Sequence, residues 1–226
     1  MSRRIVDLTL PIRAHFRWRV ERSRTGDFAR GDIFEITQLR FPVHAFTHMD
    51  SPRHFVPDGP TTSDIPLSAT IGEAAVIDLA DVGPMTAIES GRLAERAGHV
   101  RRGDIVLLRT GWYARRSIDD PAFWLEAPWL ERDAAVWLRD RGVRACGFDF
   151  PQDYTIRFLL AGEVRPREEH VTHFELLAHG VILIEYLTNT LQLVSPRVEF
   201  FALPLFVPDA DGAPVRAIAW EAEGSA

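Results

Sequence analysis

Four short apolar runs spaced along the chain constrain its fold more than any other feature of the sequence. They span residues 74–78, 105–109, 143–148 and 181–187. Apolar runs of this length, bounded by turn-forming or charged residues, are typical of strands buried in a sheet. Helices are expected between and beside them, over residues 91–97, 131–140 and 172–179, the last closed by Gly180. Intermingled strands and helices predict one α/β domain over residues 1–226, built on a mixed sheet.

The remaining segments complete this expected fold. Residues 33–41 alternate well enough for a strand, with Ile33, Glu35, Thr37 and Leu39 on one face. Residues 12–31 are rich in arginine and aromatic side chains without a clear period, so we interpret them as a long loop or short helix over a site. Further strands are expected over residues 5–10, 200–206 and 213–220.

Composition excludes several classes of function. The formal net charge is −6 and no dense basic block occurs, which argues against a nucleic-acid partner. All basic side chains are arginine, so Schiff-base and P-loop lysine chemistry are excluded. No apolar run reaches the length of ~18 residues that a membrane span needs, and no secretory signal precedes Pro11. A cytoplasmic protein with a small-molecule substrate is expected, and the lone Cys146 indicates no internal disulfide.

Three histidines and an aspartate cluster in the segment from residue 44 to residue 54. These are His44, His48, Asp50 and His54. Imidazole and carboxylate groups are the ligands that zinc, manganese and iron accept. A straight strand would separate His44 from Asp50 by roughly 20 Å, and a helix would turn Asp50 away from both histidines. The cluster therefore predicts a metal or catalytic site only if the backbone turns sharply after His44; otherwise it is a polar surface loop.

A second carboxylate points to the same chemistry from a distant part of the chain. Glu185 lies inside the apolar run 181–187, where an unpaired charge would be costly. A metal ion would supply a partner, although Glu185 could instead face water at the strand end. His173, at the start of the preceding helix, could turn toward the same end of the sheet.

These residues resemble the cyclase family of metal-dependent hydrolases, which includes bacterial kynurenine formamidases and isatin hydrolases. The family signature, His-x-Gly-Thr-His-x-Asp-x-Pro-x-His, is matched by residues 44–54 except that Phe46 replaces the glycine. His173 and Glu185 match a later element of a histidine at a helix start and a glutamate on the next strand. Weaker similarities occur at residues 6–9, 108–112 and 147–149. The resemblance extends over nearly the whole chain.

The resemblance implies a fold, a metal set and a reaction. It implies a swivelling β/β/α-type fold and a homodimer or homotetramer, with loops of a neighbour closing the pocket. His44, His48 and Asp50 would hold one divalent ion, zinc or manganese. His173 and Glu185 would help to hold a second ion, with Asp50 bridging the two. A metal-activated water would cleave a small amide, formylated or cyclic.

By the same resemblance, His54 would act as the general acid and base that carries a proton to the leaving nitrogen. The two departures from the family pattern lie where substrate would be bound: Phe46, and residues 150–153 with Gln152. A phenyl ring at position 46 is expected to narrow or reshape the pocket. Together with Trp18 and Phe16, Phe46 could form an apolar wall for an aromatic substrate.

Three alternatives remain open at the level of the sequence. The same metal site could hydrolyse a lactone, a carbamate or a cyclic imide. The chain could be a metal-dependent binding protein without activity, although such a protein has no use for a proton shuttle at His54. His44, His48 and Asp50 would also suit a mononuclear iron site in a redox enzyme.

Overall fold

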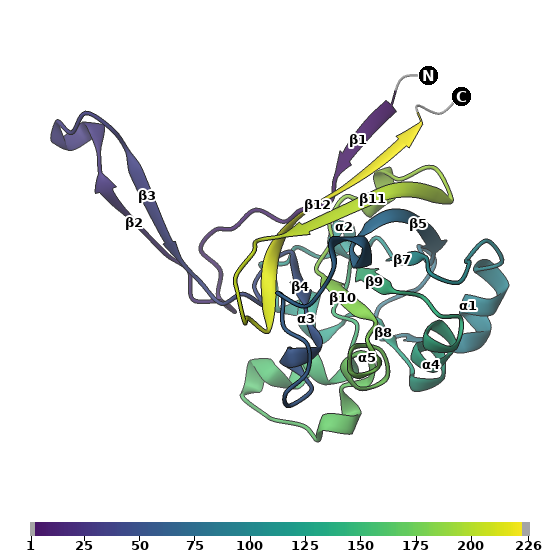
Figure 1. Cartoon of the computed structure of the whole chain (residues 1–226). Coiled ribbons are helices and arrows are strands. Elements are labelled where there is room, and N and C mark those ends of the chain that lie inside the picture. The colour runs from purple at the N-terminus through teal and green to yellow at the C-terminus, as the bar shows by residue number, and fades with distance from the viewer. Residues whose placement is uncertain (1–2, 223–226) are drawn as a thin grey trace.

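The computed structural model describes residues 3–222 and contains one large mixed sheet with helices packed on it (Figure 1). The sheet has eight strands in the order β1-β12-β11-β5-β7-β9-β10-β4. Their bounds are β1 Arg3–Asp7, β4 His48–Asp50, β5 Ile71–Asp78, β7 Ile105–Arg109, β9 Ala145–Phe148, β10 Ile182–Glu185, β11 Arg197–Pro204 and β12 Gly212–Ala222. Strands β5, β7, β9 and β10 run parallel, and the other pairs are antiparallel.

The long strand β12 closes the sheet on itself. Its later residues pair with β1 and β11, while its first residues, Gly212 to Pro214, pair with β4. Because β4 also pairs with β10, the strands from β12 round to β4 form a closed ring. This closure brings the start of β12 beside the segment that carries the predicted metal ligands.

Alternating side chains on each strand divide the core into two parts. Val76, Leu107, Ile184 and Phe200 point into the ring and form one buried cluster. The neighbouring residues on the same strands, such as Ile77 and Leu108, point outward into a second cluster beneath the helices. Since side chains alternate between the faces of a strand, the parallel strands β5, β7, β9 and β10 bury both faces. This explains why the parallel strands are continuous apolar runs in the sequence.

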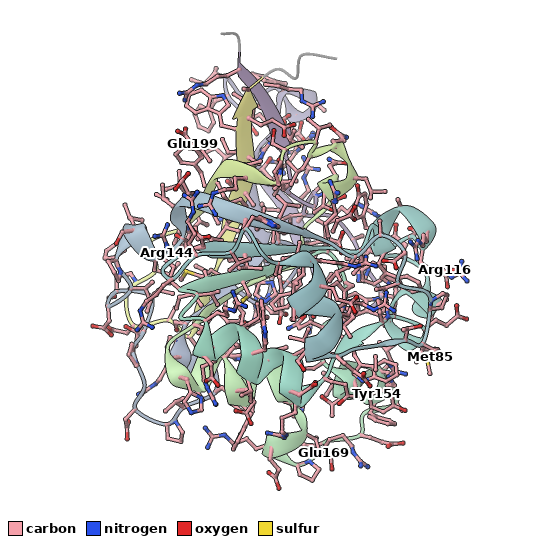
Figure 2. The ribbon with its side chains drawn as sticks, turned by 90° about the vertical axis from the view of Figure 1, so that its right-hand side faces the viewer. Met85, Arg116, Arg144, Tyr154, Glu169 and Glu199 are labelled. Carbon is pink, nitrogen blue, oxygen red and sulfur yellow. The ribbon has the colours of Figure 1, made fainter. Side chains whose placement is uncertain are left out.

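Helices cover the outer face of the sheet, and Figure 2 shows them gathered on one side of it. The α-helices are α1 (Ser90–Arg96), α2 (Trp112–Arg115), α3 (Pro121–Leu125), α4 (Arg132–Asp140) and α5 (Val171–Glu175). Short 3₁₀ helices span Phe28–Arg30, Pro52–His54, Leu67–Ala69, Tyr154–Ala161, Arg167–Glu169, Leu177–His179 and Thr190–Gln192. A separate small sheet pairs β6 (Ala87–Ile88) with β8 (Trp129–Leu130) in parallel, just before α1 and α4 respectively. No helix in residues 3–222 is long and apolar enough to cross a membrane.

A hairpin of β2 (Glu21–Gly26) and β3 (Ile36–Arg40) projects from the body of the protein (Figure 1). All residues of β3 are exposed, and only Gly26 of β2 is buried. We call this hairpin, residues 21–40, the arm.

The mixed α/β architecture predicted from the sequence is confirmed, with local differences. The segment 12–31, expected to be a loop or short helix over a site, contains strand β2 of the arm. The helix expected over residues 172–179 ends at Glu175 and continues as a 3₁₀ turn, which Gly180 closes with a positive φ of 83°. The strand expected at 33–41 is present as β3, but neither of its faces is buried by the described residues.

Candidate metal centre

Two neighbouring strands place three of the predicted ligands on the same face of the sheet. Strand β4 runs antiparallel to β10, with Glu185 directly opposite His48 and Ile184 opposite Met49. Met49 and Ile184 point into the ring and belong to its core. Their neighbours His48, Asp50 and Glu185 therefore point to the outer face, where all three are buried.

The sharp turn on which the sequence argument depends occurs at Phe46. This residue has a φ of 58°, in the left-handed region that favours glycine. The turn aims the Phe46 carbonyl back at the chain, where it accepts hydrogen bonds from His48 Nδ1 (2.9 Å) and from the Tyr186 N–H (3.1 Å). The turn thus orients His48 and also ties the loop to the end of β10.

Hydrogen bonds fix which ring nitrogen of two histidines faces the site. His48 Nδ1 must carry the proton, because its partner at Phe46 is a carbonyl. His173 Nδ1 lies 2.7 Å from Asp153 Oδ2, and the other oxygen of that carboxylate accepts the Thr172 N–H. Each ring therefore presents its Nε2 to the site. A histidine held by its other nitrogen in this way is typical of metal ligands.

The two Nε2 atoms face carboxylate oxygens at short range. His48 Nε2 lies 3.2 Å from Asp50 Oδ1 and 3.6 Å from Glu185 Oε2. His173 Nε2 lies 3.6 Å from Asp50 Oδ2 and 3.7 Å from Glu185 Oε1. Nitrogen lone pairs and carboxylate oxygens repel one another, so the arrangement requires a positive charge among them, from ring protons or from a cation.

A divalent ion fits this requirement. Asp50 Oδ2 is buried and has no hydrogen-bond partner among the described residues, so it has an unused lone pair directed into the cluster. His44, His48 and Asp50 offer ligand atoms within 4.8 Å of one another, and so do Asp50, His54 and His173. Imidazole with carboxylate is a donor set that zinc and manganese accept. The two groups share Asp50, the residue expected to bridge two ions.

The electrostatics of the cluster are dominated by burial and by pairing. Burial alone would raise the pKa of Asp50, but the surrounding imidazoles lower it well below its ordinary value. Burial and the nearby charge of Asp50 raise the pKa of Glu185. Burial would lower the pKa of His44, yet its hydrogen bonds to Asp50 and Asp211 raise it to about 9. Burial also lowers the pKa of His54, to about 4.

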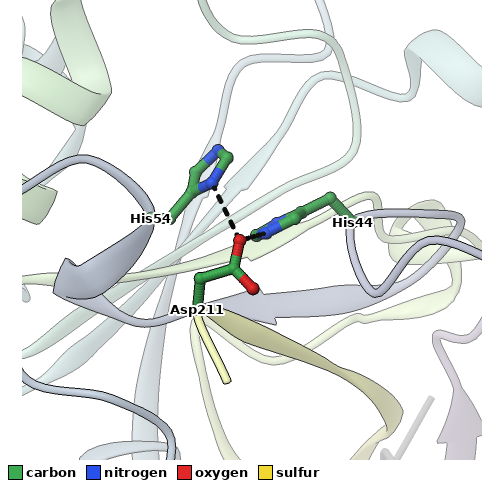
Figure 3. Close-up of side chains that lie close together, drawn as sticks. All are labelled: His44, His54 and Asp211. Atoms are coloured by element: carbon green, nitrogen blue, oxygen red, sulfur yellow. Dashed lines mark hydrogen bonds and ion pairs between the residues drawn. The ribbon is translucent and has the colours of Figure 1, made fainter. Parts of the chain in front are cut away.

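Asp211 is a member of the cluster that the sequence analysis missed (Figure 3). Its Oδ2 accepts a hydrogen bond from His44 Nε2 at 2.8 Å and lies 3.6 Å from His54 Nδ1. It precedes Gly212, whose pairing with Asp50 brings β12 to the site. A Cβ on Gly212 would lie 2.7 Å from His44 Cε1, so only glycine allows this close approach. The acidic turn 209–211 before the last strand was the one available signal, and it is weak because such turns are common on surfaces.

The cluster opens into a cavity of about 750 Å³. His44, His48, His54, His173 and Glu185 line it, together with aromatic and aliphatic side chains. Trp18, predicted to contact substrate, is in this wall. A cavity of this size suits a small organic molecule.

The other two residues predicted to contact substrate are placed differently. Phe46 is not among the residues that line the cavity; its ring is buried and packs on Trp18, with 4.7 Å between ring centroids. The ring of Phe46 therefore shapes the pocket through Trp18, and its carbonyl does so through His48. Gln152 is also buried behind the wall, and its Nε2 donates to Glu185 Oε1 and to Thr172 Oγ1. These contacts use only the amide nitrogen and hold Glu185 in place, while Gln152 Oε1 is buried without a hydrogen-bond partner among the described residues.

A family model described as "Putative cyclase" matches residues 6–152, more than half of the chain. This chain belongs to that family. Kynurenine formamidase of Bacillus mycoides (strain KBAB4) is 29% identical over 185 residues, covering 81% of this chain and 78% of the relative. Kynurenine formamidase of Bacillus cereus strain ATCC 14579 is equally similar, at 29% over the same coverage.

Solved structures of the cyclase family share the fold. A predicted metal-dependent hydrolase from Bacillus stearothermophilus superposes with a TM-score of 0.75 at 27% identity, covering 97% of this chain and 99% of that one. An isatin hydrolase bound to the product analogue thioisatinate gives a TM-score of 0.79 at 22% identity, with 98% and 93% coverage. This cyclase-family chain thus shares its fold with both structures.

Proposed function

We propose that this protein is a metal-dependent hydrolase that cleaves a small amide. The observation that carries the proposal is the pair of oriented imidazoles, His48 and His173, whose Nε2 atoms face Asp50 and Glu185 at the wall of a cavity. The similarity to kynurenine formamidases supports an amide as the bond that is broken.

The residues of the cluster divide into ligands and a proton carrier. His44, His48, Asp50, His173 and Glu185 would hold one or two divalent ions, zinc or manganese. A bound ion lowers the pKa of water and polarises a carbonyl group. Gln152 and Asp153 hold Glu185 and His173 in position from behind.

His54 is placed to move the proton. Its ring stacks on His44, with 3.8 Å between centroids, and lines the cavity. Its Nδ1 lies 3.6 Å from Asp211 Oδ2, and we assign the opposite edge of the ring to the substrate. In hydrolysis of a formamide, His54 would pass a proton to the nitrogen as the carbon–nitrogen bond breaks, which releases an amine and a carboxylate.

Metal content and turnover of matched variants test this proposal. We expect at least one divalent transition ion per chain in the purified protein, and most of it lost in His48→Ala. His179→Ala is the matched control, because His179 is exposed and lies outside the cavity. Equal metal content in wild type and His48→Ala would overturn the metal site.

Turnover is measured with formanilide, a cyclic amide and a lactone. We expect His54→Ala to keep most of its metal and to lose about 100-fold or more in kcat on the amides. If only the lactone is turned over, the substrate class is an ester rather than an amide. Metal-loaded protein inactive on all three would indicate a binding protein, and oxygen consumption would indicate an iron redox enzyme.

A further inference from the structure

An arginine in the wall of this cavity has no partner of opposite charge among residues 3–222. Arg17 lies on the loop between β1 and the arm and lines the same cavity as His48, His54 and Glu185. Its Nη1 is buried and makes no hydrogen bond within residues 3–222. No carboxylate in that part of the chain lies within the 4.0 Å of an ion pair with Arg17, whereas the nearby Arg13 binds Asp119 through both of its terminal nitrogens.

Aromatic rings hold the Arg17 guanidinium in place. Its central carbon lies 4.2 Å from the centroid of the Trp124 ring and 6.0 Å from that of Trp18. Stacking on an aromatic face fixes the plane of a guanidinium but supplies no hydrogen-bond acceptor. The donors of Arg17 are thus oriented and unused, and a buried donor without an acceptor is unfavourable.

The other charges of the cavity leave the positive charge of Arg17 unbalanced. Asp50 and Glu185 would be neutralised by a divalent ion, and Asp211 is paired with His44. The aromatic rings within reach of the Arg17 guanidinium are those of Trp18 and Trp124, and Phe16, next to it in the sequence, also lines the cavity. A planar guanidinium with free donors matches the two oxygens of a carboxylate.

We propose that Arg17 binds a carboxylate carried by the substrate, so that this site selects anionic aromatic amides. This inference rests on the proposed hydrolase function. His54 would act on the amide at the metal-ligand side of the cavity, while Arg17 holds the anionic end and the aromatic wall holds the ring.

Two substrates that differ only in charge test the proposal. Formanilide is neutral, and 3-formamidobenzoate adds a carboxylate too far from the formamide to react with it. For the wild type we expect kcat/KM for the anion to exceed that for formanilide by on the order of 10- to 100-fold. Arg17→Gln should remove this preference, chiefly by raising KM for the anion. Its kcat/KM for formanilide should stay within about twofold of the wild-type value.

Two further variants separate charge recognition from a structural role. Arg17→Lys keeps the positive charge but lacks the two parallel donors of a guanidinium. It should therefore retain part of the preference for the anionic substrate. Arg19→Gln is the matched control and should leave both substrates unchanged, because Arg19 is 86% exposed and pairs with Glu21 outside the cavity. An equal loss of activity on both substrates in Arg17→Gln would show that Arg17 only supports the loop, and would overturn the proposal.

Binding of benzoate keeps this test independent of turnover. Calorimetry with the metal-loaded protein should show benzoate binding that benzamide does not match and that Arg17→Gln lacks, while melting temperatures verify folding. If Arg17→Gln binds benzoate as the wild type does, the carboxylate lies on the metal and Arg17 is not its receptor. If benzoate binding depends on Arg17 but neither the formamides nor the cyclic amide and lactone are cleaved, the anion site is supported and the proposed hydrolase function fails.

Discussion

Phe46 combines a strained backbone with a fully buried ring. Its left-handed conformation produces the turn that orients His48, and its ring packs against Trp18 and His15. A residue with a Cβ pays roughly 1 kcal/mol for this conformation, and glycine does not. The ring offsets that cost through burial, and the two effects can be separated by substitution.

At position 46 we predict that the glycine variant is more stable than the alanine variant, the reverse of the usual order. Phe46→Ala loses the buried ring but keeps the strained conformation, so the free energy of unfolding should fall by about 3–5 kcal/mol. Phe46→Gly loses the same ring and relieves the strain, so it should be more stable than Phe46→Ala by about 1 kcal/mol. Urea unfolding of both variants measures the difference.

Phe148 in β9 provides the control for this order. It is equally buried but has no positive φ. Alanine should therefore be the less harmful replacement at position 148, by about 0.5–1 kcal/mol over glycine. The same ranking at both positions would show that the turn at Phe46 is not strained.

At the level of elements, an ion pair connects strands that are not adjacent. Asp104 precedes β7 and Arg197 begins β11, with β5 between the two strands. The two guanidinium nitrogens of Arg197 lie 2.7 and 2.8 Å from the carboxylate oxygens of Asp104. The N–H of Arg101 donates to the same carboxylate at 2.7 Å.

The pH dependence of stability should reveal this ion pair. Burial would raise the pKa of Asp104, but Arg197 and the Arg101 N–H hold it below its ordinary value of about 3.9. Ionised Asp104 therefore stabilises the fold above about pH 4, and this contribution is lost as the pH falls through the lowered pKa. Asp104→Asn should cost about 2 kcal/mol at pH 7, and its difference from wild type should shrink between pH 4 and pH 3.

Urea unfolding at pH 7, 5 and 3 measures the effect. Glu73→Gln is the comparison, because Glu73 contacts the same Arg197 from an exposed position. It should change stability by less than about 0.5 kcal/mol at pH 7. A constant difference between Asp104→Asn and wild type down to pH 3 would contradict the assignment.

The elements that the sequence predicted best are those buried on both faces. The runs that became β5, β7, β9 and β10 are continuous apolar stretches, which only a fully covered strand tolerates. The run that became β3 alternates, and alternation does not tell which protein surface covers the apolar face. The arm was therefore missed although its second strand was expected.

In the site, too, the residues that could be predicted are those that lie close together in the sequence. His44, His48, Asp50 and His54 could be predicted because they lie within one short segment. Asp211 and Asp153 were missed because their partners, His44 and His173, lie far away in the sequence. Only the pairing of β12 with β4 and the packing of α5 bring them together.

At the scale of the whole molecule, the arm is too exposed for a hairpin that stands alone. Ile33 is 89% exposed, and Phe34, Ile36 and Leu39 are about half exposed. A two-stranded hairpin without packing on one face is marginally stable in water. We therefore expect another copy of the chain to cover the arm, in agreement with the oligomer that the resemblance implies.

Oligomeric state is the measurement for this expectation. Light scattering should give the mass of a homodimer or homotetramer for the wild type. Ile33→Asp combined with Leu39→Asp should shift the protein toward monomer, because the charges would have to be buried in the contact. Val164→Asp, at a position 88% exposed and outside the arm, should leave the mass unchanged. A monomeric wild type, or an unchanged mass in the double variant, would refute this role of the arm.

The closure of the ring by β12 sets the time at which the metal centre can be completed during synthesis. Asp50 and Gly212 are paired neighbours, yet ~160 residues separate them in the sequence. A ribosome that adds ~5–20 residues per second needs roughly ten to thirty seconds to make the intervening chain. For most of that interval β4 lacks both of its strand partners, β10 and β12, and His44 lacks Asp211. The candidate metal centre therefore reaches its final geometry only after the last strand has been synthesised.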